Sequence, residues 1–326
     1  MTQRFDGLNL AAIACALPTQ TCPLEAFIPR FGESKVQRFR AMAGIEALPI
    51  AEPNTTASML AEAAAHRLIR EGRLHPEEVD ALLFISQTPD ATAPATAALL
   101  QKRLGLPEHI LALDLNGGCS GFLLGLLTAA HLLQHPSPQK ILILGGDTLS
   151  RIVDPADYTA AMLFGDAGFA ALLTRGGSTP WHFLSATAGD DAITIPHGQP
   201  FHMDGTRVFN FTISRVPEQI SALLAACHAQ ASDFDLLLLH QANAFIINQI
   251  ARLLHLPPEK VPCRMARRGN TSSASLPLLL CDLAAEGLTG DRKLLLSAFG
   301  VGLSWISAAL SFNFANALPT NSERIA

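Results

Sequence analysis

Three segments of this 326-residue chain carry side chains that could do chemistry, and the most informative of them surrounds Cys119. The run 116–122 (NGGCSGF) lies between a predicted buried strand and a predicted apolar helix. Its three glycines permit a tight turn, so the thiol would lie at a helix N-terminus, where partial positive charge favours thiolate over thiol. A small apolar cysteine in a packed turn is the alternative. The flanking glycines, which the other five cysteines lack, favour a nucleophile.

His240 and Asn270 are the candidates in the other two segments. His240 directly follows the apolar run 235–239 (DLLLL), and the carboxyl end of a buried strand borders the crevice where α/β proteins bind ligands. Asn270 stands in residues 267–275 (RRGNTSSAS), a sequence typical of a helix start with close backbone approach. Taken alone, each could be structural: a satisfied buried histidine and the turn residue of a capped helix. The glycine-rich turn 298–302 (AFGVG) could complete an anion cradle with its backbone N–H groups.

The elements that must position these residues are short apolar runs alternating with helical stretches. Strands that are apolar throughout suit a sheet covered by helices on both faces, which predicts an α/β fold. The predicted strands are residues 80–86, 111–115, 140–144, 235–239 and 293–298. The predicted helices are residues 91–104, 120–134, 245–254 and 275–286. The apolar stretch 8–17 is interpreted as a first buried strand and not as a targeting signal.

A similar spacing of predicted strands occurs twice along the chain. The strands beginning at residues 80 and 140 are about 60 residues apart, and those beginning at 235 and 293 are about 58 apart. This suggests two duplicated halves, residues 1–175 and 176–326. Any α/β protein could space its strands this way, so the spacing alone leaves duplication open.

Composition excludes several classes of protein. Apolar residues make up 49% of the chain and charged residues 16%, which excludes disorder and a coiled coil. The net charge is 23 − 28 = −5, so we expect no nucleic-acid partner. Six cysteines without close-spaced pairs predict reduced thiols in the cytoplasm and no metal site. Every stretch of 18 residues is interrupted by polar residues, so we expect no membrane span.

These motifs stand in one order, and together they resemble the β-ketoacyl-acyl carrier protein synthase III family. The resemblance rests on Cys119 in NGGCSGF, His240 in HQAN, Asn270 in GNTSSAS and the FGVG turn. Residues 163–168 (LFGDAG) are similar to that family's FGDGAG-type turn. The similarity runs from about residue 8 to residue 313. It implies a thiolase-like five-layered αβαβα fold with two pseudo-duplicated halves, and a homodimer.

The resemblance also implies roles for these residues. Cys119 would attack a primer thioester and become acylated, while His240 and Asn270 would hydrogen-bond the carbonyl oxygen of a malonyl-type extender as carbon dioxide leaves. The carbanion would then attack acyl-Cys119 and give a β-ketoacyl product. The N–H groups of Cys119 and Val301 would hold the other oxyanion. The substrates would be acyl thioesters of coenzyme A or of an acyl carrier protein, with no tightly bound cofactor.

Several positions depart from the family's pattern. Arg38 and Met42 stand where the family commonly carries a tryptophan and an arginine against coenzyme A, and Asn210 replaces a lysine. Phe245 replaces a basic residue that contacts phosphate and carrier, and Ala93 replaces the aromatic that one subunit lends to its partner's pocket. The residues expected at the substrate pocket and dimer gate are Ala93, Phe209 and Phe245. A substitute basic rim for the carrier would consist of Lys35, Arg38, Arg40, Arg264, Arg267 and Arg268, which could equally be solvated surface.

We therefore expect a ketosynthase III-like condensing enzyme of specialised lipid or polyketide metabolism, with acyl carrier protein as its partner. The nearest alternative is a non-decarboxylating acyltransferase that passes the acyl group from Cys119 to an amine, hydroxyl or β-keto nucleophile. A hydrolase would need an acidic partner for His240 that the sequence does not indicate. An idle subunit of a heterodimer would usually have lost Cys119 or His240.

Overall fold

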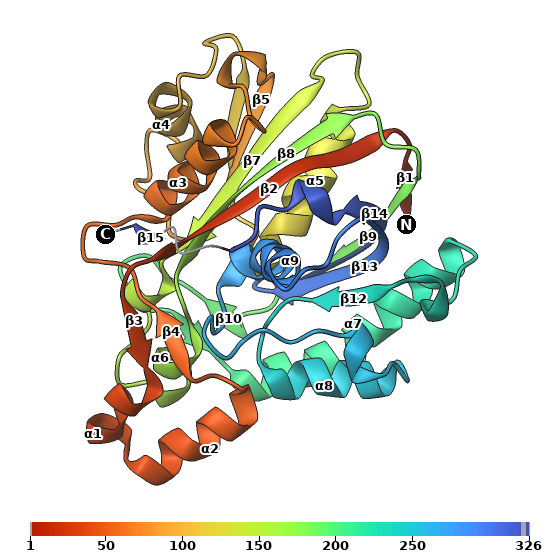
Figure 1. The fold of residues 1–326 in the computed structure, drawn as a ribbon. Coiled ribbons are helices and arrows are strands. Elements are labelled where there is room, and N and C mark those ends of the chain that lie inside the picture. Colours follow the sequence, from red (N-terminus) through yellow and green to blue (C-terminus); the bar gives the residue numbers. More distant parts are fainter. Residues whose placement is uncertain (1, 321–323, 326) are drawn as a thin grey trace.

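Two mixed β-sheets form the centre of the molecule in the computed structural model, which describes residues 2–320 and 324–325 (Figure 1). The strand orders are β15-β2-β8-β7-β5-β6 and β1-β9-β14-β13-β12. The first sheet consists of β2 (Leu8–Pro18), β5 (Ala81–Ile85), β6 (Leu111–Leu115), β7 (Lys140–Asp147), β8 (Ala167–Arg175) and β15 (Arg324–Ile325). The second consists of β1 (Gln3–Phe5), β9 (Trp181–Thr187), β12 (Leu236–Leu239), β13 (Asp291–Gly300) and β14 (Ser304–Asn313). Two small sheets pair β3 (Thr21–Pro23) with β4 (Ala47–Pro49) and β10 (Ile193–Thr194) with β11 (His202–Met203).

Helices form three layers, one between the sheets and one on each outer face (Figure 1). The middle layer consists of α5 (Gly121–Leu132) and α9 (Ser275–Ala285). The outer layers are α3 (Ala57–Arg70) with α4 (Thr96–Arg103), and α7 (Gly205–Ala226) with α8 (Ala244–Leu253). The remaining helices are α1 (Ile28–Phe31), α2 (Glu33–Ala43) and α6 (Tyr158–Leu163). This is the five-layered αβαβα fold that the motif resemblance implies. Within residues 2–320 and 324–325, no helix has both the length and the apolar composition to cross a membrane.

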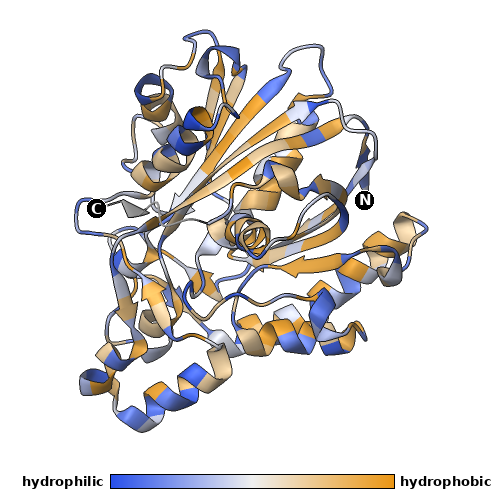
Figure 2. Ribbon diagram, in the orientation of Figure 1, coloured by the Kyte–Doolittle hydropathy of each residue, from blue (hydrophilic) through white to orange (hydrophobic). Residues whose placement is uncertain are grey.

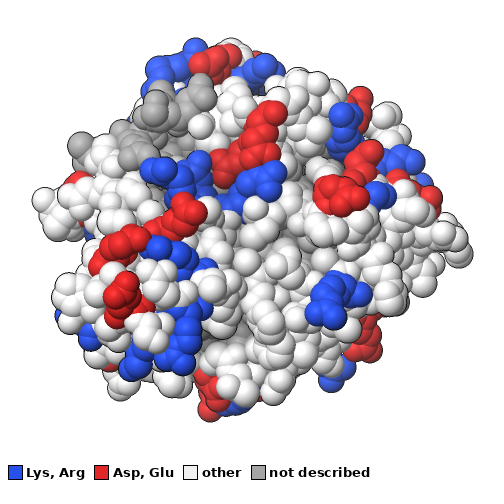
Figure 3. Space-filling view, turned by 60° about the horizontal axis from the view of Figure 1, so that its bottom comes forward, with Lys and Arg blue, Asp and Glu red and all other residues white. Residues whose placement is uncertain are grey.

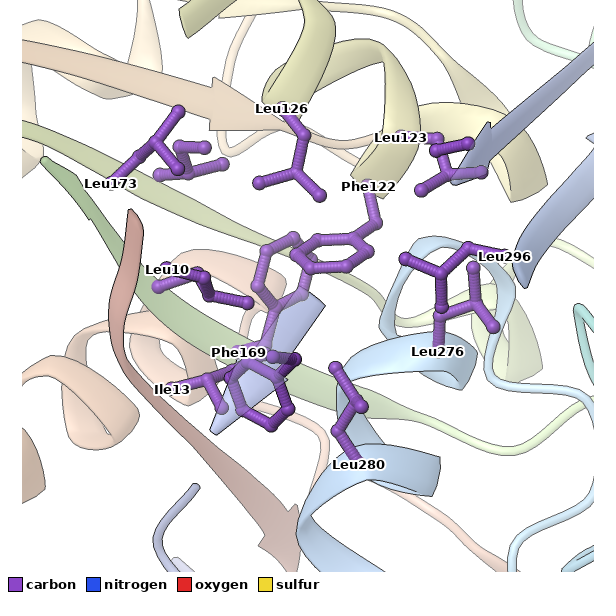
Figure 4. Close-up of a cluster of buried hydrophobic side chains, with 14 of the residues drawn as sticks. Leu10, Ile13, Phe122, Leu123, Leu126, Phe169, Leu173, Leu276, Leu280 and Leu296 are labelled. Carbon is purple, nitrogen blue, oxygen red and sulfur yellow. The ribbon is translucent and has the colours of Figure 1, made fainter. Parts of the chain in front are cut away.

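Alternating side chains on the central strands connect these layers. On β5, Leu83 and Ile85 face the middle layer, while Leu82 and Phe84 face the outer helices. The middle helices are apolar on nearly every side because a sheet covers each of their faces (Figure 2). Figure 4 shows Phe122 of α5 in this layer, among side chains from α9, β2, β8 and β13.

The two halves repeat one topology. In the first sheet β2, β8, β7 and β5 are successive neighbours, with two antiparallel pairs followed by a parallel pair. In the second sheet β9, β14, β13 and β12 follow the same order with the same directions. The middle-layer helices α5 and α9 precede β7 and β13, respectively. The topology therefore confirms the duplication that strand spacing left open.

One predicted helix boundary is wrong. The predicted helix 91–104 begins only at Thr96, because Pro94 disfavours the helical conformation in the residue before it. The other predicted strands and helices lie within three residues of their predicted ends.

Each end of the chain adds a strand to the sheet that consists mainly of the other half. Strand β8 ends at Arg175 and β9 begins at Trp181, but β1 pairs with β9 in the second sheet and β15 pairs with β2 in the first. Residues 321–323 and 326 of the predicted second half lie outside the described residues. The division into 1–175 and 176–326 stays a prediction.

Candidate active site

The turn that carries Cys119 connects β6 to α5 and is shaped by glycine. Gly118 has a left-handed φ of +49°, and a Cβ there would come within 2.2 Å of the Val301 side chain. Gly121 begins α5 so close to β5 that a Cβ would lie 2.4 Å from Ile85. Because both positions leave no room for a side chain, Cys119 is held at the start of α5, against the second half of the molecule.

The turn after β13 lies directly against Cys119. A Cβ on Gly300 would lie 2.7 Å from the Cβ of Cys119, so the backbone of this turn approaches the nucleophile. The hydroxyl oxygens of Ser120 and Ser304 are 2.6 Å apart, and Ser304 donates to the carbonyl of Val301 at 2.9 Å. These bonds tie the Val301 turn to the N-terminus of α5.

His240 follows β12 at the carboxyl end of a buried strand. Its N–H donates to the carbonyl of Ser297 on β13 at 2.8 Å, and its Nδ1 lies 2.6 Å from the hydroxyl oxygen of Ser275. Burial lowers the pKa of His240 to about 3, so the imidazole is neutral at physiological pH. Because Ser275 occupies Nδ1, Nε2 is the nitrogen left for a ligand.

Asn270 is fixed by the segment that leads into β8. Its N–H donates to the carbonyl of Leu163 at 2.9 Å, and its carbonyl accepts from the N–H of Gly165 at 3.0 Å. A Cβ on Gly165 would lie 2.3 Å from the carbonyl oxygen of Arg268, so these two backbones meet closely. The side-chain Oδ1 accepts the N–H of Ser272 at 2.9 Å. The amide NH2 of Asn270 is therefore the group that can donate to a ligand.

Cys119, His240 and Asn270 line one cavity of about 500 Å³. The wall is mainly apolar and includes Leu149, Leu163, Phe164, Phe201, Met203 and Ile246. Phe209 and Phe245 also line it and stack with ring centroids 5.5 Å apart, and 42% of Phe245 is exposed. A concave apolar wall with a few convergent polar groups is typical of a small-molecule site. Within the described residues, no group of three or more histidine, cysteine or acidic side chains could hold a metal ion.

The resting state of Cys119 differs from the expectation of a thiolate at a helix N-terminus. The pKa of the Cys119 thiol is raised to about 12, mainly by burial; a hydrogen bond with Ser272 opposes the rise and the nearby carboxyl of Asp147 adds to it. Loss of hydration thus outweighs the groups that favour the anion, and Cys119 is a thiol at physiological pH.

Not all of the residues predicted for the substrate pocket and dimer gate line the cavity. Phe209 and Phe245 line the cavity, whereas Ala93 is exposed and does not line it. Ala93 lies in the segment before α4, where the N–H groups of Thr96 and Ala97 each donate to the carboxylate of Asp114 at 2.7 Å. These bonds hold the Ala93 segment beside β6, the edge strand of the first sheet.

Half of the predicted basic rim is engaged in ion pairs. The pairs are Arg40 with Glu25, Arg264 with Glu286 and Arg268 with Asp282, and none of the three arginines lines the cavity. Arg267 is exposed and does not line it either. Arg38 and Lys35 instead line a hollow of about 290 Å³, which shares Met42 and Tyr158 with the cavity. Figure 3 shows lysine and arginine side chains, mixed with acidic ones, gathered at lower left on the side of α1 and α2.

Sequence reasoning missed three polar groups behind Cys119. The Ser272 hydroxyl lies 3.8 Å from the sulfur and donates to Oε1 of Gln87, whose N–H donates to Asp147. Gln87 follows β5 closely, as His240 follows β12, so the rule that selected His240 could have found it. Asp147 ends the buried strand β7, so the same rule could have found it as well.

Two family models match the chain. The model described as 3-oxoacyl-[acyl-carrier-protein (ACP)] synthase III matches residues 113–192, and the model of that synthase's C terminal matches residues 224–312. The first match contains Cys119, and the second contains His240 and Asn270.

Curated relatives and solved structures agree with these matches. β-Ketoacyl-[acyl-carrier-protein] synthase III 3 of Streptomyces coelicolor is 36% identical over 326 aligned residues, covering 93% of this chain and 96% of the relative. Synthase III 2 of the same organism is 40% identical and covers 86% of each chain. The crystal structure of 3-oxoacyl-(acyl-carrier protein) synthase from Burkholderia xenovorans LB400 superposes with a TM-score of 0.93, at 34% identity and 98% coverage of both chains.

Proposed function

This chain belongs to the β-ketoacyl-acyl carrier protein synthase III family of condensing, acyl-transferring enzymes, and we propose that Cys119, His240 and Asn270 perform its chemistry. The observation that carries the proposal is that a thiol and two neutral hydrogen-bond donors line one cavity. A nucleophile and donors for a developing oxyanion are what acyl transfer followed by carbon–carbon bond formation requires.

In the first half-reaction, the sulfur of Cys119 attacks the carbonyl of an acyl thioester. A sulfur–carbon bond forms to Cys119, the carbon–sulfur bond of the donor breaks, and the proton of the Cys119 thiol leaves with the donor sulfur. The N–H groups of Cys119 and Val301 hold the oxyanion of the tetrahedral intermediate. The closeness of Gly300 to Cys119 supports this role for the turn.

In the second half-reaction, a malonyl-type thioester loses carbon dioxide. The electron pair of the broken carbon–carbon bond becomes an enolate, whose oxygen accepts hydrogen bonds from Nε2–H of His240 and the NH2 of Asn270. The enolate carbon attacks acyl-Cys119, a new carbon–carbon bond forms, and the Cys119 thiolate departs and takes a proton from solvent, which restores the thiol. The low pKa of His240 suits this step, because a neutral imidazole stabilises the enolate oxygen without protonating it.

The residues at the mouth of the cavity indicate which kind of acyl donor it accepts. Exposed apolar side chains border it, with Met42 45%, Tyr158 47% and Phe245 42% exposed, and Met42 and Phe245 stand where the family pattern has basic residues. We therefore include in the proposal a cytoplasmic enzyme of specialised lipid metabolism that takes its substrates from an acyl carrier protein or a modified thioester. Lys35 and Arg38, beside the mouth, are the basic groups available to a carrier.

A homodimer through β6 is also part of the proposal. Strand β6 is the edge of the first sheet, and Leu111 and Leu113 on it are 44% and 38% exposed. An edge strand with exposed leucines favours pairing with another chain. The Ala93 segment lies beside this edge, so pairing there would bring it toward the partner. Size-exclusion mass should give twice the chain mass, whereas a complex with a different ketosynthase would instead appear only when both are present.

Intact-protein mass spectrometry tests the chemistry. Wild type incubated with an acyl thioester should gain the acyl mass, and Cys119→Ala should gain none. Addition of a malonyl thioester should then release one carbon dioxide per β-ketoacyl product, which separates condensation from simple acyl transfer. Equal labelling of both proteins would overturn the role of Cys119, and acyl transfer without carbon dioxide would overturn condensation.

A further inference from the structure

A chain of hydrogen bonds runs from the sulfur of Cys119 into the core, away from the cavity. Cys119 Sγ lies 3.8 Å from Ser272 Oγ, which donates to Gln87 Oε1 at 3.2 Å. The N–H of Gln87 donates to Asp147 Oδ1 at 2.6 Å, and the hydroxyl of Ser273 donates to Asp147 Oδ2 at 3.1 Å. The chain joins residues from both halves of the molecule, since Ser272 and Gln87 are separated by 185 positions.

From this geometry we propose that Ser272 is a further catalytic residue, whose hydroxyl donates a hydrogen bond to the sulfur of Cys119 whenever that sulfur is anionic. Gln87 and Asp147 are positioning residues that present the hydroxyl. The inference rests on the proposed acylation of Cys119.

The backbone at Ser272 supports a dedicated role. Ser272 is fully buried and begins the 3-10 turn Ser272–Ala274 with a left-handed φ of +51°. A non-glycine residue is strained there, and such strain persists only where the surroundings over-determine it. The same residue donates its N–H to Oδ1 of Asn270. One strained serine thus orients the carboxamide of Asn270 and aims a hydroxyl at the nucleophile.

Among the side chains around the sulfur that the structure describes, no charged group could stabilise an anion on it in place of the Ser272 hydroxyl. The titratable groups that face Cys119 are Asp147 behind Ser272, and His240 and Tyr158 in the cavity wall. Asp147 disfavours an anion on sulfur, and buried His240 is neutral. No lysine or arginine lines the cavity among residues 2–320. Beyond the N-terminus of α5, the Ser272 hydroxyl is the side-chain hydrogen-bond partner that the structure gives to the thiol.

The hydroxyl changes partner as charge develops. In the resting site the thiol donates to Ser272 Oγ, and Ser272 donates to Gln87. As the thiol proton leaves for the departing donor sulfur, the Ser272 hydrogen rotates from Gln87 Oε1 to Cys119 Sγ. It returns to Gln87 once the sulfur is acylated, and the second half-reaction repeats the exchange when the Cys119 thiolate is released.

The rate of alkylation by iodoacetamide at a fixed, mildly alkaline pH, well below the pKa of about 12, tests this without an acyl substrate, because the thiolate is the reactive form and its fraction sets the rate. Modification of the peptide containing Cys119 is followed by mass spectrometry in wild type, Ser272→Ala and Ser272→Gly. A hydrogen bond to a charged group predicts that both variants lower the rate of Cys119 alkylation at this pH by about 10- to 100-fold, because less of the thiol is ionised. The glycine variant accepts the left-handed backbone, so it separates loss of the hydroxyl from misfolding.

Two outcomes would decide the matter. Slower alkylation in both folded variants supports the donor role of Ser272, and a wild-type alkylation rate in the folded glycine variant overturns it. Neither result depends on the condensing reaction. Failure of wild type to accept an acyl group would count against the proposed function, but it would not change the comparison of alkylation rates among the three proteins.

Discussion

The turns that precede α5 and α9 occupy equivalent places in the two halves, yet they are built from different residues. Each is a 3-10 turn, Gly118–Ser120 in the first half and Ser272–Ala274 in the second. Each begins with a left-handed residue, Gly118 at φ +49° and Ser272 at φ +51°. The fold therefore fixes the same backbone shape twice, and the halves differ in what they attach to it.

The first turn carries a nucleophile and otherwise removes side chains. Glycine at 118 relieves backbone strain and makes room for Val301, so the backbone of the opposite half can approach Cys119. The second turn keeps a serine in the strained position and adds the carboxamide of Asn270. The duplicated scaffold thus divides the chemistry: one copy supplies the attacking atom, and the other supplies donors for the charges that the attack creates.

Removing the carboxamide of Asn270, a donor supplied by the second half, should have the largest effect on the condensation rate. Asn270→Ala is expected to lower the condensation rate by about 10²- to 10³-fold, the usual loss for one oxyanion donor, because the enolate loses the NH2 group. Acylation of Cys119 should persist, since Asn270 acts in the second half-reaction. Product formation and acyl-enzyme mass, measured on the same samples, check both statements. Condensation at the wild-type rate would contradict the assignment.

Adding a methyl group to the first turn should damage its shape. Gly118→Ala places a Cβ at positive φ and 2.2 Å from Val301, so we expect a loss of about 2–4 kcal/mol in the free energy of unfolding, together with slower acylation. Urea unfolding measures the first effect. Gly189→Ala is the matched control, because nothing lies within 4 Å of its Cβ. A Gly118→Ala protein as stable as this control would contradict the account of the turn.

Acid should destabilise the molecule through His240, which lies in the second half. Its pKa is about 3 in the folded protein and near 6.5 in the unfolded chain, so the unfolded state binds the proton first. The stabilisation is complete above pH 6.5 and is lost as pH falls toward 3, at up to about 1.4 kcal/mol per pH unit. Unfolding curves of wild type and His240→Gln across this range should differ in slope by about one proton. Parallel curves would mean that His240 is accessible to protons in the folded state.

The smallest expected effect isolates the strain at the second turn. Ser272→Gly should be about 0.5–1 kcal/mol more stable than Ser272→Ala, because both lack the hydroxyl and only glycine is relaxed at φ +51°. Thermal unfolding of the two variants measures the difference. An alanine variant that is the more stable of the two would show that the left-handed conformation is not strained.

Local patterns in the sequence predicted much of the fold and the centre of the site. Continuous apolar strands and their spacing indicated helix-covered sheets, and the glycines around Cys119 indicated a tight turn before a helix. They do not indicate contacts between distant residues. Arg264 and Arg268 could border a carrier surface or be ordinary solvated surface, and the structure shows that each pairs with an acidic residue.

The sequence by itself determined the helix-covered sheets and the order of the motifs, because strand hydrophobicity and turn chemistry depend on neighbours along the chain. The resemblance of those motifs to a known family then selected Cys119, His240 and Asn270. The tertiary structure decided the protonation of the site and the partners of its nucleophile. Burial, and not the helix terminus, governs the pKa of Cys119, and the serine beside its sulfur comes from 153 positions away. Desolvation and long-range contacts arise only when the two halves close upon each other, so no local pattern encodes them.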